Sequence, residues 1–139
     1  MKKAIFALRL ALGWLFTYAG LTKIADSSWS AAGYLNNAGT FQGLFAWFAS
    51  PSNIGWVNFI NEWGLLIIGI SLLIGLWVRW TSIAGIVLMA LYYFPVLNFP
   101  MAGEHSFIVD EHIIYVLSFW IFIVSDAGRY KGLDGRKVK

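Results

Sequence analysis

The few charged residues of this chain fall almost entirely at the ends of long apolar runs. Of its 139 residues, 59% are apolar and 12% are charged. A soluble domain of this length leaves a large share of its surface exposed and could not hide so much apolar area. The runs also approach the length of about 20 residues that a helix needs to cross a bilayer. The sequence therefore predicts an all-α integral membrane protein with one transmembrane domain over residues 1–139.

Four apolar runs are candidates for membrane-spanning helices. They cover residues 4–24, 54–78, 80–97 and 107–125. Strands of a membrane β-barrel would alternate polar and apolar residues, and none of these runs does. We therefore expect a four-helix bundle, in which Pro95 breaks or kinks the third helix near its end.

Lysine and arginine residues indicate how this bundle is oriented. With the N-terminus on the cytoplasmic side, the inner helix ends and the tail carry Lys2, Lys3, Arg9, Arg79, Arg129, Lys131, Arg136, Lys137 and Lys139. The outer ends carry only Lys23. Because positive residues beside short loops favour the cytoplasmic side, we expect both termini to be cytoplasmic and the protein to lie in the inner (cytoplasmic) membrane. The N-terminal run also resembles a signal peptide, but Arg9 interrupts it and its length exceeds a typical cleaved core.

Residues 33–50 are partly apolar but form no clean span. Aromatic and leucine side chains recur at helical spacing between Phe41 and Phe48, and polar residues such as Asn36 and Gln42 lie among them. The segment carries no lysine, which most interfacial helices have on their polar face. It is therefore predicted to be an interfacial or re-entrant helical segment packed over the outer end of the bundle.

Acidic residues and histidines gather at the opposite helix ends from the basic residues. Only Asp126 and Asp134 depart from this pattern. Glu62 lies near the outer end of the second helix, where a carboxylate is costly unless it faces the bundle interior and has a partner. A structural alternative is that a negative residue near a helix N-terminus is stabilised by the helix dipole.

The densest group of titratable residues lies before and at the start of the fourth helix. It consists of Glu104, His105, Asp110, Glu111 and His112. Histidine beside a carboxylate can transfer protons near neutral pH, so His105 and Glu111 are candidate catalytic residues together with Glu62. We expect His112 to be exposed near the interface. Neither adjacent Glu–His pair places two ligands on one helical face, so no metal site is predicted.

One stripe of the first helix combines basic and small residues. Arg9, Gly13, Phe16, Gly20 and Lys23 fall on one face at 3.6 residues per turn. Because glycines allow a neighbouring helix to approach closely, the stripe is expected to face the bundle. The alternatives are that Arg9 extends to lipid phosphates and that Lys23 caps the helix C-terminus.

The composition excludes several kinds of chemistry. The chain has no cysteine, which rules out disulfides, thiolate nucleophiles and iron–sulfur clusters within it. It carries no haem or flavin motif. Although the isoelectric point is near 9.3, the basic residues lie at helix ends and in the tail. Interaction with anionic lipid therefore explains them better than nucleic-acid binding does.

Three ordered stretches resemble the DoxX/DoxD family of small four-helix membrane proteins. They are residues 9–23 (RLALGWLFTYAGLTK), residues 61–79 (NEWGLLIIGISLLIGLWVR), and residues 105–134, which end in GRYKGLD. The resemblance implies a respiratory or redox-linked role, because the family includes the membrane subunit of thiosulfate:quinone oxidoreductase and other members associate with oxidative-stress proteins. The positions it marks are Arg9, Lys23, Glu62, Arg79, His105 and Glu111.

Two functions of different kinds follow from these patterns. In the first, the chain is the membrane subunit of a quinone-linked oxidoreductase. Glu62, His105 and Glu111 exchange protons with the quinone, and the predicted substrate-binding residues are Lys23, Arg9, Arg79, Tyr93 and Trp63. Lys23 stabilises anionic charge or attracts an anionic reductant such as thiosulfate, and electrons pass directly or from a partner redox subunit. In the second, the chain is a non-catalytic scaffold or assembly factor. A solute carrier is less favoured because no broken helix pair or repeat is present. The sequence leaves open whether the protein forms a homo-oligomer.

Overall fold

Helices make up most of the computed structural model, which describes residues 1–136. Three of them are long and apolar enough to cross a membrane: α1 (Lys2–Ala25), α4 (Ile54–Ile74) and α5 (Val78–Val96). The fourth apolar helix, α6 (Glu111–Val124), has 14 residues and is about 21 Å long, shorter than a hydrocarbon core of about 30 Å. The structure therefore supports a helical membrane bundle with three helices of spanning length. Lys137 and Lys139, which belong to the predicted basic tail, lie outside the described residues.

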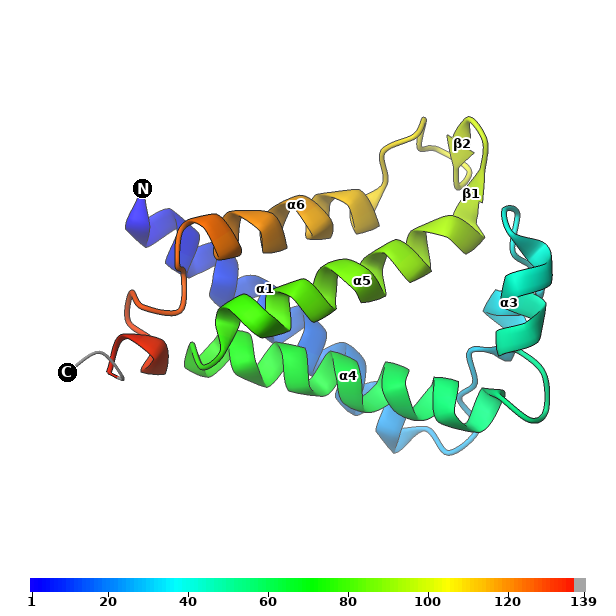
Figure 1. The fold of residues 1–139 in the computed structure, drawn as a ribbon, viewed down its shortest axis with the longest axis horizontal. Coiled ribbons are helices and arrows are strands. Elements are labelled where there is room, and N and C mark those ends of the chain that lie inside the picture. Colours follow the sequence, from blue (N-terminus) through cyan, green and yellow to red (C-terminus); the bar gives the residue numbers. More distant parts are fainter. Residues whose placement is uncertain (137–139) are drawn as a thin grey trace.

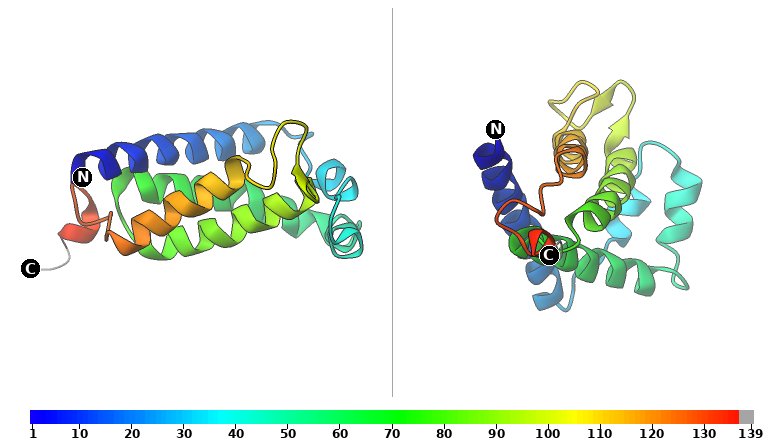
Figure 2. Two further views of the ribbon diagram at one scale, coloured as in Figure 1. Left: turned by 90° about the horizontal axis from the view of Figure 1, so that it is seen from above. Right: turned by 60° about the vertical axis from the view of Figure 1, so that its left-hand side comes forward.

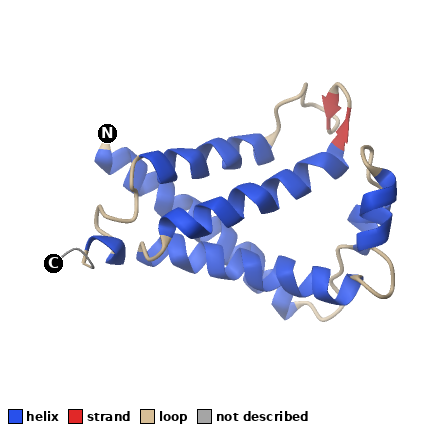
Figure 3. Ribbon diagram, viewed as in Figure 1, coloured by secondary structure: helices blue, strands red, loops and turns tan. Residues whose placement is uncertain are grey.

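The four apolar helices run in alternating directions along one axis (Figures 1 and 3). The N-terminus and the last described residues lie at one end of the bundle, which we call the terminal end (Figure 2). The short helices α2 (Ala32–Asn36) and α3 (Gln42–Phe48) lie at the other end with a hairpin of β1 (Leu97–Asn98) and β2 (Met101–Ala102). We call this the cap end. The two ends match the predicted separation of basic residues from acids and histidines.

Glycines bring α1 and α4 into close contact. A Cβ atom on Gly69 of α4 would lie 2.3 Å from the Thr17 nitrogen, and one on Gly20 of α1 would lie 2.6 Å from the Leu66 nitrogen. Backbones this close leave no room for a side chain. Arg9, Gly13, Phe16 and Gly20 are all buried and Lys23 is half-buried, so the first four residues of the predicted stripe face the bundle as expected.

Aromatic side chains fill the centre of the bundle. Phe119 and Phe122 of α6 and Leu72 of α4 are fully buried, and the Phe16 ring of α1 lies edge-on to Phe119. On α5, Gly85 makes room for the Phe119 ring, since a Cβ there would lie 2.5 Å from the ring. This aromatic packing holds α6 against α5 and α1.

The predicted bounds of the second and third helices need correction at their junction. The second helix was expected over 54–78, but α4 ends at Ile74 because Gly75 adopts the left-handed conformation, with φ 69°. A glycine at this position is a common helix stop. The third helix was expected from residue 80, but α5 begins at Val78, where the Asp134 carboxylate accepts hydrogen bonds from the Trp77 and Val78 amides at 2.8 and 3.0 Å. Pro95 lies in the last turn of α5, and the helix ends one residue later.

The segment between α1 and α4 forms a cap over the bundle. Within the predicted range 33–50, the structure has two short helices instead of one, with a left-handed residue, Phe41, between them. The cap is tied to the end of α5 by hydrogen bonds from the Gly39 amide to the Pro95 carbonyl (2.9 Å) and from the Thr40 hydroxyl to the Leu97 carbonyl (2.5 Å). These bonds satisfy carbonyls that a helix end leaves without partners. We use the name "cap" for residues 29–50.

The fourth helix begins later than predicted. Residues 107–110 were expected to be helical, but α6 starts at Glu111 because Asp110 is its N-cap. The Asp110 carboxylate accepts hydrogen bonds from the His112 amide (3.0 Å) and the Ile113 amide (3.3 Å). Aspartate is a favoured residue at this position, where it satisfies free amide groups.

Candidate functional site

A polar pocket of about 360 Å³ opens at the cap end. Residues from α1, the cap, α4, α5 and α6 line it: Lys23, Trp29, Ser30, Ala31, Tyr34, Asn61, Tyr92, Val96, Glu111 and His112. The pocket thus brings together side chains that lie far apart in the sequence. We call it the polar pocket.

His112 is held by the residue that caps its own helix. Its Nδ1 lies 2.6 Å from the second carboxylate oxygen of Asp110, a buried residue. An ionised carboxylate only accepts hydrogen bonds, so Nδ1 is the donor and Nε2 remains for a ligand. The imidazole also packs edge-on against the rings of Tyr92 and Tyr115, at centroid distances of 5.8 and 6.5 Å. These contacts fix the orientation of the ring.

Lys23 reaches the same pocket without an acidic partner. Its ammonium lies 5.0 Å from the centre of the Trp29 ring. Among residues 1–136, it has no carboxylate within 4.0 Å and no hydrogen bond. The structure thus gives no support for Lys23 as a cap on the last carbonyls of α1. A half-buried cation held only by an aromatic ring can accept an anionic or strongly polar ligand.

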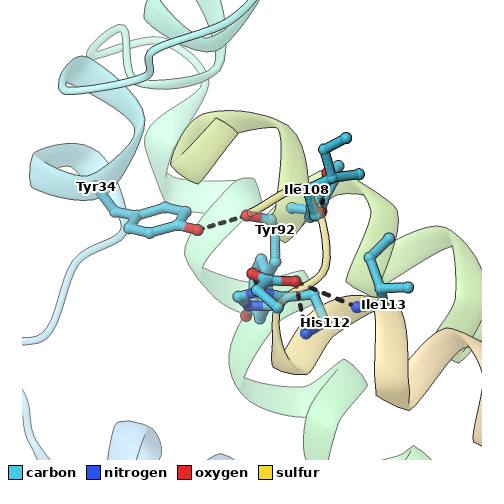
Figure 4. Close-up of polar contacts among 7 residues, drawn as sticks. Tyr34, Tyr92, Ile108, His112 and Ile113 are labelled. Carbon is cyan, nitrogen blue, oxygen red and sulfur yellow. Dashed lines mark hydrogen bonds and ion pairs between the residues drawn. The ribbon is translucent and has the colours of Figure 1, made fainter. Parts of the chain in front are cut away.

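A chain of hydrogen bonds forms one wall of the polar pocket. The Tyr34 hydroxyl donates to the Tyr92 carbonyl at 2.5 Å (Figure 4), and the Tyr92 hydroxyl donates to the Asn61 side-chain oxygen. Asn61 in turn donates to the Val57 carbonyl at 2.8 Å. Burial, followed by the negative charges of Asp110 and Glu111, raises the pKa of Tyr34, so this hydroxyl stays protonated as a donor.

Two further cavities adjoin the polar pocket. One has a volume of about 250 Å³, lies between α4, α5 and the cap, and shares Ala31, Tyr34, Asn61 and Tyr92 with the polar pocket. We call it the apolar pocket. The other, of about 200 Å³, lies between α1 and α6 and shares Lys23, Tyr92, Glu111 and His112 with the polar pocket. We call it the α1–α6 cleft.

The structure brings together some of the predicted site residues and separates others. Glu111 and Lys23 both line the polar pocket. Glu62 is half-buried on α4 and His105 is exposed in the loop before α6, and neither lines the polar pocket, the apolar pocket or the α1–α6 cleft. Asn61, next to Glu62, and His112 line the polar pocket instead. The roles predicted for Glu62 and His105 in proton exchange stay predictions.

The two predicted aromatic residues also lie outside the pocket lining. Tyr93 is buried, and its hydroxyl donates to the Ile108 carbonyl at 2.5 Å, which ties the loop before α6 to α5. Trp63 is partly exposed on α4 and packs beside Phe59, with ring centroids 6.2 Å apart. Their predicted contacts with a substrate remain untested.

Arg9 and Arg79 lie at the terminal end, far from the polar pocket. Arg9 and Lys23 are separated by about 21 Å along α1. Arg9 is fully buried, and its guanidinium donates to the carbonyls of Ala127 (2.6 Å) and Lys131 (3.2 Å). Arg79 is exposed at the start of α5. The predicted reach of Arg9 to lipid phosphates is thus replaced by contacts within the protein.

Four residues of this site were not among the residues predicted for it, although Asp110 and His112 belong to the titratable group noted in the sequence. These are Asn61, Tyr92, Asp110 and His112. The expectation that His112 is exposed near the interface is wrong, because the ring is half-buried between Asp110, Tyr92 and Tyr115. An aspartate just before an apolar helical run is an N-cap signal and would have placed His112 in the first turn of α6. No sequence signal indicated that Tyr92 of α5 would meet Asn61 of α4.

Within residues 1–136, no three His, Asp or Glu side chains lie close enough together to hold an ion. What the polar pocket does offer is a carboxylate, an oriented imidazole and an ammonium around one cavity.

Comparison with known proteins relates most of the chain to one family. A family model described as DoxX matches residues 4–97. The match contains α1, the cap, α4 and α5, and therefore the first two of the three stretches on which the resemblance rests. The third stretch, with α6, lies outside it. Neither the curated proteins nor the solved structures gave a match.

Proposed function

The chain belongs to the DoxX family of membrane proteins, and on this premise we propose that it is the membrane subunit of a quinone-linked oxidoreductase. The polar pocket would bind the quinone headgroup. The observation that carries the proposal is one cavity that combines an acid, an oriented imidazole and an unpaired ammonium and shares a wall with an apolar pocket. A quinone needs both a polar and an apolar cavity, because its polar ring is joined to an apolar tail.

In the membrane, the proposed arrangement has four crossings with both termini in the cytoplasm. Both described ends lie at the terminal end (Figure 2), and α6 runs from the cap end back toward it, which supports a fourth crossing by a helix shorter than the other three. Basic residues cluster at the terminal end, which favours its cytoplasmic placement in an inner membrane. The polar pocket then opens toward the outer face.

The proposed chemistry is reduction of a quinone to a quinol. The quinone takes up two electrons and two protons, and one proton is added to each carbonyl oxygen. We assign one proton to the Glu111 carboxylic acid and the other to the imidazolium form of His112, which gives up its Nε2 proton while Nδ1 keeps its hydrogen bond to Asp110. Water at the cap end then returns a proton to each group. Asp110 positions the imidazole through Nδ1. Lys23 stabilises negative charge on the quinone oxygen as electrons arrive.

The electrons come from a reduced donor outside this chain, which has no cysteine to hold them. An anionic reductant such as thiosulfate is one donor class, since two thiosulfates joined through a new S–S bond release two electrons. A partner redox subunit is the other. Both would approach from the cap end, where the ammonium of Lys23 lies.

The direct test is quinol formation by the purified protein, with thiosulfate as donor. Removing either proton donor, with Glu111→Gln or His112→Asn, should lower turnover about 100-fold. Glu62→Gln is the matched control, since Glu62 lies one residue from Asn61 but does not line the pocket. If turnover is lost in Glu62→Gln and kept in both other variants, the assignment to the polar pocket is wrong.

A non-catalytic scaffold or assembly factor is the second candidate. The observation that favours it is a set of large exposed apolar side chains at the cap end, including Phe41, Trp47, Phe99 and Phe107. These side chains would dock a partner protein. A stoichiometric co-purifying partner, with no quinone in lipid extracts of the purified protein, would support this function over the first.

A further inference from the structure

We infer that the prenyl tail of the quinone lies in the apolar pocket between α4, α5 and the cap. The inference rests on the proposed function and adds the route by which the substrate enters and what selects its tail. A headgroup in the polar pocket has two cavities beside it that could take the tail: the apolar pocket and the α1–α6 cleft. The chemistry of their linings differs.

No charged side chain lines the apolar pocket. Its wall consists of aliphatic and aromatic residues with one asparagine: Ala31, Tyr34, Leu35, Phe45, Phe48, Trp56, Val57, Ile60, Asn61, Leu88, Leu91 and Tyr92. Such a lining suits a hydrocarbon chain, which offers no partner for a charge.

The polar groups of this wall already have partners inside the protein. The Tyr34 hydroxyl donates to the Tyr92 carbonyl, the Tyr92 hydroxyl donates to Asn61, and Asn61 donates to the Val57 carbonyl. The Trp56 indole donates to the Asn53 side chain at 3.2 Å. A tail in this pocket would therefore displace no hydrogen bond that the protein needs.

The α1–α6 cleft offers a hydrocarbon chain a poorer lining. Lys23, Glu111 and His112 all line it. A tail laid against these groups would shield them from water without offering a partner, which is costly for charged side chains. The cleft is better suited to water and to the exchange of protons with the polar pocket.

The apolar pocket also opens where lipid would lie. Four of its lining side chains are 40–49% exposed: Tyr34 of the cap, Trp56 and Ile60 of α4, and Leu91 of α5. At about 250 Å³, the pocket exceeds an apolar cavity of about 150 Å³ that holds one benzene. It has room for the first part of a tail, and the remainder would extend between α4 and α5 into the bilayer. The quinone then enters sideways from the membrane.

Two substitutions narrow the apolar pocket without touching the polar pocket. In Ile60→Trp and Leu91→Trp, the indole would occupy the edge of the apolar pocket. The matched controls are Ile67→Trp, on an exposed face of α4 outside every cavity described above, and Ala19→Trp, in the α1–α6 cleft. Binding of a quinone with a two-isoprene tail is compared with binding of the same ring without a tail, in lipid nanodiscs.

We expect Ile60→Trp and Leu91→Trp to weaken binding of the tailed quinone about tenfold and to leave binding of the tailless ring within twofold. Both controls should leave the ratio of the two affinities unchanged. A change of that ratio in Ala19→Trp alone would overturn the inference and place the tail in the α1–α6 cleft. If the unmodified protein binds neither quinone, the proposed function itself is wrong, and the position of the tail no longer arises.

A second measurement requires no variant to fold. A quinone carrying a photoreactive diazirine on its first isoprene unit is cross-linked to the unmodified protein in nanodiscs. We expect labelled peptides from α4, α5 and the cap, near Ile60, Leu91 and Phe48. Labels confined to α1 and α6, near Leu15 and Tyr115, would contradict the inference.

Discussion

The two ends of the bundle differ in the contacts that they offer to a basic side chain of α1. At the terminal end, Arg9 is fully buried and donates to the Ala127 and Lys131 carbonyls, with its guanidinium 5.2 Å from the Phe6 ring. At the cap end, Lys23 meets one aromatic ring and a cavity. A buried cation with internal partners stabilises a fold, whereas one that faces an open pocket is available to a ligand. We therefore propose that the terminal end stabilises the fold and that the cap end binds and converts the ligand.

The acidic and histidine residues near these two cations also differ in how many partners they have. At the terminal end, Asp134 uses both carboxylate oxygens on the Trp77 and Val78 amides, and its own amide donates to the Gly75 carbonyl at 2.9 Å. The last described segment is thus tied to the turn between α4 and α5. At the cap end, Nε2 of His112 and the exposed carboxylate of Glu111 have no partner of this kind among the described residues. The difference leads to predictions that separate stability from ligand binding.

The largest effect is expected from Arg9→Met. The variant keeps much of the side-chain volume but leaves the buried Ala127 carbonyl and the partly buried Lys131 carbonyl without their donor, which should lower the free energy of unfolding by about 3 kcal/mol. Quinone affinity of the remaining folded protein should stay the same. Unfolding in a detergent titration measures the first, and Lys3→Met, an exposed cation at the same end, is the control. If Arg9→Met lost quinone affinity but kept its full stability, the proposal that only the cap end binds the ligand would be wrong.

A smaller effect, on turnover alone, is expected from Asp110→Asn. Asparagine still accepts the capping hydrogen bonds of α6, so stability should change little. It no longer offers a carboxylate to hold Nδ1 of His112, and turnover should fall about tenfold with quinone affinity unchanged. A parallel loss of thermal stability and turnover would show that Asp110 acts only as a helix cap.

The smallest effect is expected from Asp134→Ala. It removes the acceptors for the amides of Trp77, which precedes α5, and of Val78, the first residue of α5, and should cost about 1 kcal/mol of stability, within the usual range for a helix cap. Quinone affinity should not change, because Asp134 lies at the terminal end. Calorimetry of the purified protein beside Asp126→Ala, whose ion pair with Arg129 is exposed, provides the comparison.

Much of the fold could be predicted from the sequence because apolar length and charge placement are local properties of the chain. They indicated the helices, the inward-facing stripe of α1 and the separation of the two ends. The bounds at Gly75 and Asp110 were missed although glycine and aspartate are ordinary stop and start signals. The start of α5 at Val78 depends on Asp134, 56 residues away along the chain, and no local pattern contains that.

The candidate site was harder to predict for the same reason. Lys23 and Glu111 were identified because single charges near a membrane are rare. Asn61 and Tyr92 are ordinary polar residues whose importance arises only when α4 and α5 meet. His105 and His112 are seven residues apart. Because α6 starts at Glu111, His112 lies in its first turn beside the bundle, whereas His105 stays in the exposed loop before it.

The central claim is that ligand binding belongs to the cap end, and the most direct test is quinone affinity in Lys23→Gln beside Arg79→Gln. Each variant removes one cation, Lys23 from α1 or Arg79 from α5, and the sequence predicted substrate contact for both residues. Equilibrium binding of a short-tailed quinone is measured in nanodiscs. Loss of one charge-assisted hydrogen bond should weaken binding about tenfold in Lys23→Gln, while Arg79→Gln should stay within about twofold of the unmodified protein. Equal affinity in Lys23→Gln and the unmodified protein, or a loss confined to Arg79→Gln, would contradict the account.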